Sequence, residues 1–236
     1  MSSSHREEAL AAWWRELSAP AARGMRALQF EYTSRGDRVA GRLWLPDATA
    51  EPHPLVWLQR AEADAGEADS VGELSRAWVK AGAAVAAIDL PLHGARASAK
   101  LSERFRQGLF HSGCGFPEWS QLWQEFVCQS VSDLSRGCDI LSAHGAVDVR
   151  RSVYVGWELG GMVGAALCAI SPRPFLFVHV LGGEGIPRSK TEALFEAVAE
   201  PKALIELEGQ SGGGSSTAWR KIESFVKEHL GLKDFR

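Results

Sequence analysis

The sequence predicts an α/β protein with a mostly parallel sheet, an antiparallel hairpin near its start and helices on both faces. Two alternating segments, residues 28–32 and 39–45, flank a Ser-Arg-Gly-Asp turn, as expected for the strands of a hairpin. Residues 55–58 and 83–88 are short apolar runs without alternation, which is typical of strands covered on both faces. Because helical segments separate such runs along the rest of the chain, we expect the later strands to be parallel.

The later part of the chain alternates between helical periodicity and short apolar strands. The segment 118–143 has helical spacing, as one helix or two, and the last strand and helix are separated by a loop rich in glycine and serine. We therefore expect further helices at 71–81, 162–170, 189–199 and 217–230, and strands at 152–155, 175–180 and 203–207.

The N-terminal segment has a different pattern. Residues 7–17 place Leu10, Trp13, Trp14 and Leu17 on one face of a helix. This pattern divides the chain into an N-terminal helical extension, residues 1–27, and one domain, residues 28–236.

Composition excludes several classes of function. The chain has 236 residues, of which 45% are hydrophobic, and a formal net charge of −3. Neither a basic surface for nucleic acid nor an apolar run long enough for a membrane span is present, so we expect neither partner. The first residues do not resemble a signal peptide and the four cysteines are widely spaced, so we expect a cytoplasmic protein without a metal site. We also expect no cofactor, because no nucleotide-binding or zinc motif occurs.

The most informative stretch is Ser-Val-Tyr-Val-Gly-Trp-Glu-Leu-Gly-Gly at residues 152–161. A buried strand runs into a turn framed by Gly156 and Gly160, and a helix follows. This arrangement is the frame of the nucleophile elbow, G-x-S-x-G, in which a strained turn exposes a nucleophile. The central position is Glu158, so the frame is present without its serine.

With the elbow placed, the chain resembles the α/β-hydrolase superfamily, and most closely its dienelactone-hydrolase-like branch. The resemblance runs from about residue 28 to the C-terminus and includes the segment Ile-Asp-Leu-Pro-Leu-His-Gly at residues 88–94. It implies a reduced α/β-hydrolase fold, because the region after the elbow helix is too short for the usual cap and one of the usual strands.

The resemblance also locates the catalytic positions, and several of them are altered. Gln59 and Arg60 replace the His-Gly pair that opens the oxyanion loop, and Glu184 is the carboxylate nearest to the usual acid position. No histidine occurs at residues 209–216, where the catalytic base is expected. Ser211 in that loop fits G-x-S-x-G literally, but we interpret it as part of a small-residue loop. Acyl transfer needs a nucleophile and a base together, so we expect no ordinary esterase activity.

Two functions remain open. In the first, the protein is a non-hydrolytic pseudoenzyme that binds a small molecule or a protein, and Glu158 forms an ion pair with Arg60 across the former site. In the second, Glu158 acts as general acid or base on a small organic substrate in a repurposed pocket. The two functions allow as partners a small-molecule ligand, a second copy of the chain or another protein. The pocket residues that we expect around Glu158 are Gln59, Arg60, Ala61, His93, Trp157, Leu159 and Glu184.

Overall fold

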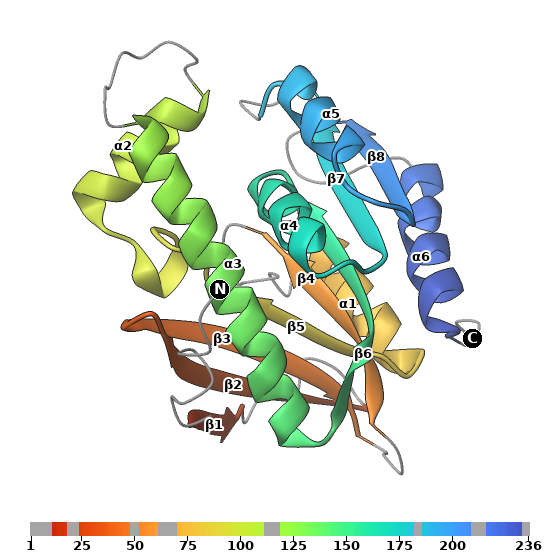
Figure 1. Ribbon diagram of the computed structural model, residues 1–236. Helices are drawn as coiled ribbons and strands as arrows, with labels where there is room; N and C mark the ends of the chain where they lie inside the picture. The colour runs from red at the N-terminus through yellow and green to blue at the C-terminus, as the bar shows by residue number, and fades with distance from the viewer. Residues whose placement is uncertain are drawn as a thin grey trace.

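The computed structural model describes residues 11–17, 24–47, 52–60, 70–110, 119–181, 186–208 and 216–232. Within them, one sheet of eight strands runs in the order β1-β2-β3-β5-β4-β6-β7-β8 (Figure 1). The strands are β1 (Ala12–Glu16), β2 (Met25–Ser34), β3 (Asp37–Pro46), β4 (His53–Gln59), β5 (Ala84–Ile88), β6 (Val147–Trp157), β7 (Phe175–Leu181) and β8 (Lys202–Glu208). The helices are α1 (Ser70–Lys80), α2 (Ala99–Phe110), α3 (Trp119–His144), α4 (Leu159–Ile170), α5 (Arg188–Glu196) and α6 (Ser216–Leu230), with a short 3-10 helix, η2, at Gly94–Arg96.

The predicted fold class is confirmed. Strand β2 pairs antiparallel with both β1 and β3, and β3 pairs antiparallel with β5. The remaining neighbours, β5 with β4, β4 with β6, β6 with β7 and β7 with β8, are parallel. The predicted hairpin is β2 and β3, and its turn residues Arg35 and Gly36 both have positive φ, as a two-residue hairpin turn requires. The segment predicted as one helix or two is the single helix α3, whereas α2 was not predicted.

Helices cover both faces of the sheet, and each face has its own core. Alternate residues of β4 show the division, since Leu55 and Trp57 belong to one buried cluster and Val56 and Leu58 to the other. The first cluster takes its helical side chains mainly from α2, α3 and α4, and the second takes them from α1 and α6. This layering places the carboxyl ends of β4, β6 and β7 between two sets of helices, where ligands bind in open α/β sheets.

The predicted N-terminal helix is wrong over the residues that the structure describes. Residues 12–16 form β1, which pairs antiparallel with β2, and residues 1–10 lie outside the described part of the chain. Trp14 packs on Phe30 with ring centroids 5.1 Å apart, whereas the neighbouring Trp13 is 50% exposed. Successive side chains of a strand point to opposite faces, and the available edge of β2 outweighs local helical spacing.

A buried ion pair ties the hairpin to the helical layer. Arg96 of η2 donates to Asp133 of α3 at 2.7 Å and to Asp37 of β3 at 2.6 Å. The Tyr32 hydroxyl of β2 donates to the Asp133 carbonyl at 2.6 Å. Burial raises the pKa of the Asp133 carboxyl, against the opposing effect of Arg96. The pair therefore fixes α3 over the antiparallel end of the sheet.

The two adjacent tryptophans of β1 allow a matched test of this correction. Trp14→Ala removes a ring packed on Phe30 and should lower the free energy of unfolding by about 2 kcal/mol or more. Trp13→Ala removes an exposed ring and should change it by less than about 0.5 kcal/mol. Denaturant titration of both variants measures the difference, and equal losses would contradict the strand assignment.

Candidate functional site

The turn between β6 and α4 has the strained geometry of a nucleophile elbow. Glu158 lies at φ 47° and ψ −111°, one of three non-glycine residues with positive φ among those described. Such a conformation costs roughly 1–3 kcal/mol and persists only where the surroundings enforce it. Here the Glu158 N–H donates to the Val178 carbonyl at 3.0 Å and the Met162 N–H donates to the Glu158 carbonyl at 3.1 Å.

Two glycines make this turn possible because backbone segments approach each other closely. A Cβ on Gly160 would lie 2.0 Å from the Gln59 carbonyl oxygen, and one on Gly156 would lie 2.5 Å from the Gly161 nitrogen. Either approach is too close for a side chain. The G-x-E-x-G frame of the sequence is therefore a packing requirement of the elbow, as its pattern predicted.

Behind the elbow, a buried tyrosine supports the first turn of α4. The Tyr154 hydroxyl of β6 donates to the Gly160 carbonyl at 2.9 Å. Complete burial raises the pKa of Tyr154 well above its ordinary value, so the hydroxyl stays protonated and keeps this bond. Burial also raises the pKa of the Cys168 thiol in α4 to about 12, which leaves this cysteine unreactive at neutral pH.

The Glu158 carboxylate turns toward β7 and the start of α5. Its Oε1 accepts the Val180 N–H and lies 3.0 Å from Nδ1 of His179, and its Oε2 accepts the Ile186 N–H at 3.1 Å. A carboxylate accepts hydrogen bonds, so this contact is a hydrogen bond when Nδ1 of His179 carries a proton. The side chain of Glu158 is 23% exposed and that of His179 is 4% exposed. We call these three contacts the Glu158 clamp.

The clamp differs from the ion pair expected from the sequence. The structure gives Glu158 the partner His179, and no ion pair joins Glu158 to Arg60, although both residues are described. Arg60 lies just beyond β4, whereas His179 lies in β7, which pairs directly with the elbow strand β6. Strand adjacency therefore brings the imidazole within reach of the carboxylate.

His179 is the site residue that sequence reasoning missed. It carries the only polar side chain in the strand Phe-Leu-Phe-Val-His-Val-Leu, and the residue as a whole is 3% exposed. Its Nδ1 also lies 3.4 Å from the Thr191 hydroxyl of α5, which is fully buried. A histidine inside an otherwise apolar, covered strand needs a buried polar partner, and that requirement was the available signal.

The other expected pocket residues are placed in different ways. Gln59 is fully buried, and its side chain amide donates to the Ile88 carbonyl at 2.6 Å, so it ties β4 to β5. His93 places Nδ1 2.8 Å from the Pro91 carbonyl and packs edge-on to Phe105, which is a structural environment.

Trp157 and Leu159, on either side of the elbow residue, belong to opposite cores. The ring of Trp157 stacks on Trp219 of α6 at 5.9 Å, whereas Leu159 belongs to the core under α3 and α4. Ala61, Glu184 and Ser211 lie outside the described residues. Within the described part of the chain, no three His, Cys, Asp or Glu side chains form a group that could hold a metal ion. None of the described helices is long and apolar enough to cross a membrane.

The Glu158 clamp predicts energetic coupling between Glu158 and His179. We expect the cycle of Glu158→Leu, His179→Phe and the double variant to show a coupling of about 0.5–3 kcal/mol in denaturant unfolding. The matched cycle with Arg60→Met should be additive within about 0.5 kcal/mol, because Arg60 and Glu158 form no ion pair. Coupling to Arg60 but not to His179 would contradict the placement of the carboxylate.

Comparison with known proteins identifies the fold and no more. No family model matches the sequence, and no curated protein matches it. Among solved structures, an acetyl xylan esterase from Paenibacillus sp. R4 has a TM-score of 0.69 at 15% identity, over 94% of this chain and 90% of that one. A cold-adapted esterase from an Arctic intertidal metagenomic library has a TM-score of 0.63 at 17% identity, over 90% of this chain and 96% of that one.

A third similar structure shares the fold. A putative dienelactone hydrolase from Klebsiella pneumoniae has a TM-score of 0.54 at 16% identity, over 92% of this chain and 99% of that one. Together with the strand order and the elbow, these likenesses show that the protein has an α/β-hydrolase fold.

Proposed function

We propose that this protein is a non-hydrolytic α/β-hydrolase-fold protein that acts by binding a small molecule or a protein. The observation that carries the proposal is the Glu158 clamp. The position that presents a nucleophile in this fold holds a carboxylate whose two oxygens accept the Val180 and Ile186 N–H groups and face His179. Through these contacts, the carboxylate connects the end of β6 to β7 and to the start of α5.

The position of the imidazole supports the same conclusion. A catalytic histidine must reach both the nucleophile and the leaving group, so it lies in a loop above the site. His179 instead lies within β7 and is 3% exposed, with its Nδ1 directed at Glu158 and near Thr191. This imidazole orients the carboxylate from inside the protein and cannot shuttle protons to a bound ester without a rearrangement of the strand.

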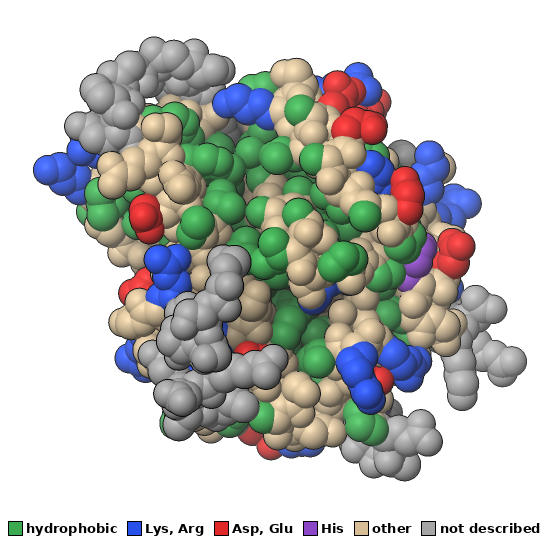
Figure 2. Space-filling view, viewed as in Figure 1, with side chains coloured by type: hydrophobic (Ala, Val, Ile, Leu, Met, Phe, Trp, Pro, Cys, Tyr) green, Lys and Arg blue, Asp and Glu red, His purple; other side chains and the backbone are tan. Residues whose placement is uncertain are grey.

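Apolar surface near the former site is consistent with binding. Figure 2 shows hydrophobic side chains gathered over the middle of the face that carries α3, α4 and α5, with charged side chains mostly around its margin. Contiguous apolar surface of this kind on a protein marks contacts with ligands or other proteins.

One observation favours the second function. The side chain of Glu158 is 23% exposed, and His179 at 3.0 Å would orient the carboxylate as a general base for a reaction other than hydrolysis. Proton abstraction from a small organic substrate requires only one positioned base. The variant Glu158→Gln distinguishes the two functions. It abolishes turnover if Glu158 is a general base, and it changes only stability and binding if the protein is non-hydrolytic and acts by binding.

The proposal predicts an absence of serine chemistry. A fluorophosphonate probe should leave the protein unlabelled, because the elbow carries a carboxylate in place of a serine and the histidine beside it, His179, is 4% exposed and engaged with that carboxylate. Intact-protein mass spectrometry reads the result directly.

Glu158→Ser is the matched variant for this experiment. It restores a hydroxyl at the elbow but removes the clamp, and it should hydrolyse short activated esters no faster than Glu158→Ala. Stoichiometric labelling of the unmodified chain at any serine, Ser211 included, would overturn the proposal. Substantial turnover by Glu158→Ser would show that a histidine of this chain reaches the elbow.

A further inference from the structure

The outer edge of β8 forms one end of the eight-stranded sheet, as β1 forms the other. β7 pairs with the inner edge along the whole strand, from Lys202 to Glu208, and no other described strand pairs with the outer edge. An outer edge presents a row of backbone N–H and C=O groups to which another strand can bind. The question is which strand fits it.

Backbone geometry shows which residues present these groups. The Phe175 N–H of β7 donates to the Pro201 carbonyl, so odd-numbered residues of this segment direct their backbone groups toward β7. Because successive residues alternate, the even-numbered residues direct theirs outward. These are Lys202, Leu204, Glu206 and Glu208; the Lys202 N–H already donates to the Glu200 carboxylate at 2.9 Å, and a partner strand would displace that carboxylate.

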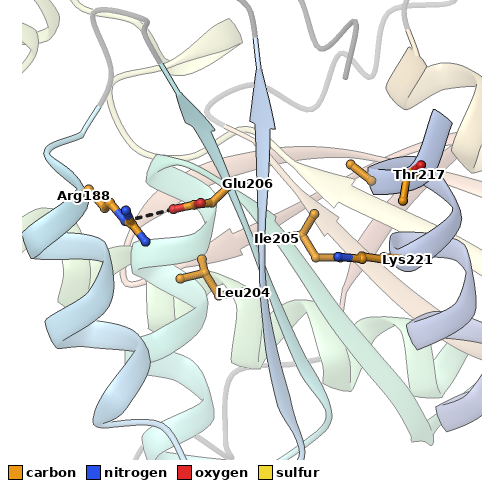
Figure 3. A pocket seen from close by; sticks show the side chains of 7 residues that line it. Arg188, Leu204, Ile205, Glu206, Thr217 and Lys221 are labelled. Carbon is orange, nitrogen blue, oxygen red and sulfur yellow. Dashed lines mark ion pairs between the residues drawn. The ribbon is translucent and has the colours of Figure 1, made fainter. Parts of the chain in front are cut away.

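The space beside this edge is a groove between two helices. A pocket of about 410 Å³ lies there, lined by residues of α5, β8 and α6. Figure 3 shows Glu206 turned toward Arg188 of α5 on one side of the strand, and Ile205 turned toward Thr217 and Lys221 of α6 on the other. A strand added along β8 would thus have a helix near each of its faces.

The sequence of β8 is complementary to itself in reverse. Written antiparallel and centred on Ile205, Lys202 lies opposite Glu208 and Ala203 opposite Leu207, and each pair occurs twice about the axis. In this register the outward-directed residues meet only one another, which is what the hydrogen-bonded pairs of an antiparallel ladder require. We propose that β8 pairs in this way with β8 of a second copy of the chain, which joins the two sheets into one.

The charges along the strand suit this partner. The Lys202 ammonium contacts the backbone carbonyls of Phe195 and Glu196, which are neutral acceptors, so its charge can attract a carboxylate of the partner. Glu208 is exposed at the other end of the strand. Glu206 would lie opposite Leu204 of the second copy, which carries no charge. Arg188 of the same chain forms an ion pair with Glu206 at 2.9 Å and so compensates this carboxylate. A closed two-fold contact of this type is the commonest arrangement of soluble homodimers.

The inference deepens the binding role proposed above by naming a second copy as one partner. It does not depend on the state of Glu158, because β8 and the elbow use different residues. The two proposals can fail separately. A dimer with esterase activity would contradict the proposed function and support the pairing of β8, whereas a monomer without esterase activity would contradict only the pairing of β8.

Sedimentation equilibrium of the full chain tests the proposal. The unmodified protein should dimerise, and Lys202→Glu and Glu208→Lys should each raise the dissociation constant roughly tenfold or more, because each places two like-charged pairs across the axis. An equimolar mixture of the two variants should recover the affinity, since every charge pair in the mixed dimer is again opposite. Residues 202 and 208 are too far apart within one strand for this recovery to arise inside a single chain.

Two further variants make the result specific to the strand edge. Leu204→Pro removes an outward N–H without touching the ladder to β7 and should abolish the dimer, with an unchanged circular dichroism spectrum. Glu125→Lys makes the same charge change as Glu208→Lys on an exposed position of α3 and should have no effect. A monomer at all accessible concentrations, or a dimer that withstands both charge variants and Leu204→Pro, would overturn the proposal.

Discussion

The geometry around the elbow depends on the carboxylate of Glu158. The residue occupies a strained conformation, φ 47° and ψ −111°, which needs compensation from its surroundings. Its side chain supplies part of that compensation by accepting the Val180 and Ile186 N–H groups and by pairing with His179. In a hydrolase of this fold the same strain presents a reactive group to substrate. In this protein the strain is retained, and the group at its apex connects two strands and a helix.

This arrangement explains how the fold can hold an elbow whose central residue is a glutamate. The close approach of Gly160 to the Gln59 carbonyl and the bond from Tyr154 to Gly160 hold the turn from outside the carboxylate. The elbow is thus part of how β4, β6 and α4 pack, and the loss of a nucleophile does not remove the need for it. A polar residue placed there must still be satisfied, and His179 with two backbone amides satisfies Glu158.

The two ends of the sheet have different surroundings. At one end, β1 pairs with β2 and its Trp14 packs on Phe30, and no described strand lies beyond β1. At the other end, β8 follows β7 with no described strand beyond it, and a groove between α5 and α6 runs beside it. The question of binding therefore concerns the edge of β8 as well as the elbow, because unpaired edges are where proteins bind strands.

The sequence by itself determined the fold class, the hairpin, and the elbow with Glu158 at its centre. Each of these rests on local information: strict alternation in residues 28–32, apolar runs such as 55–58, and glycines at 156 and 160 that only a tight turn requires. Tertiary structure decided the rest. Trp13 and Trp14 fit a helical stripe as well as a strand, and only the available edge of β2 selected the strand. The partner of Glu158 was decided in the same way, because Arg60 is suggested by position in a motif, whereas His179 is brought to the carboxylate by the pairing of β6 with β7. Sequence spacing carries no information on which neighbouring strand will supply a buried group, and that choice is made when the sheet assembles.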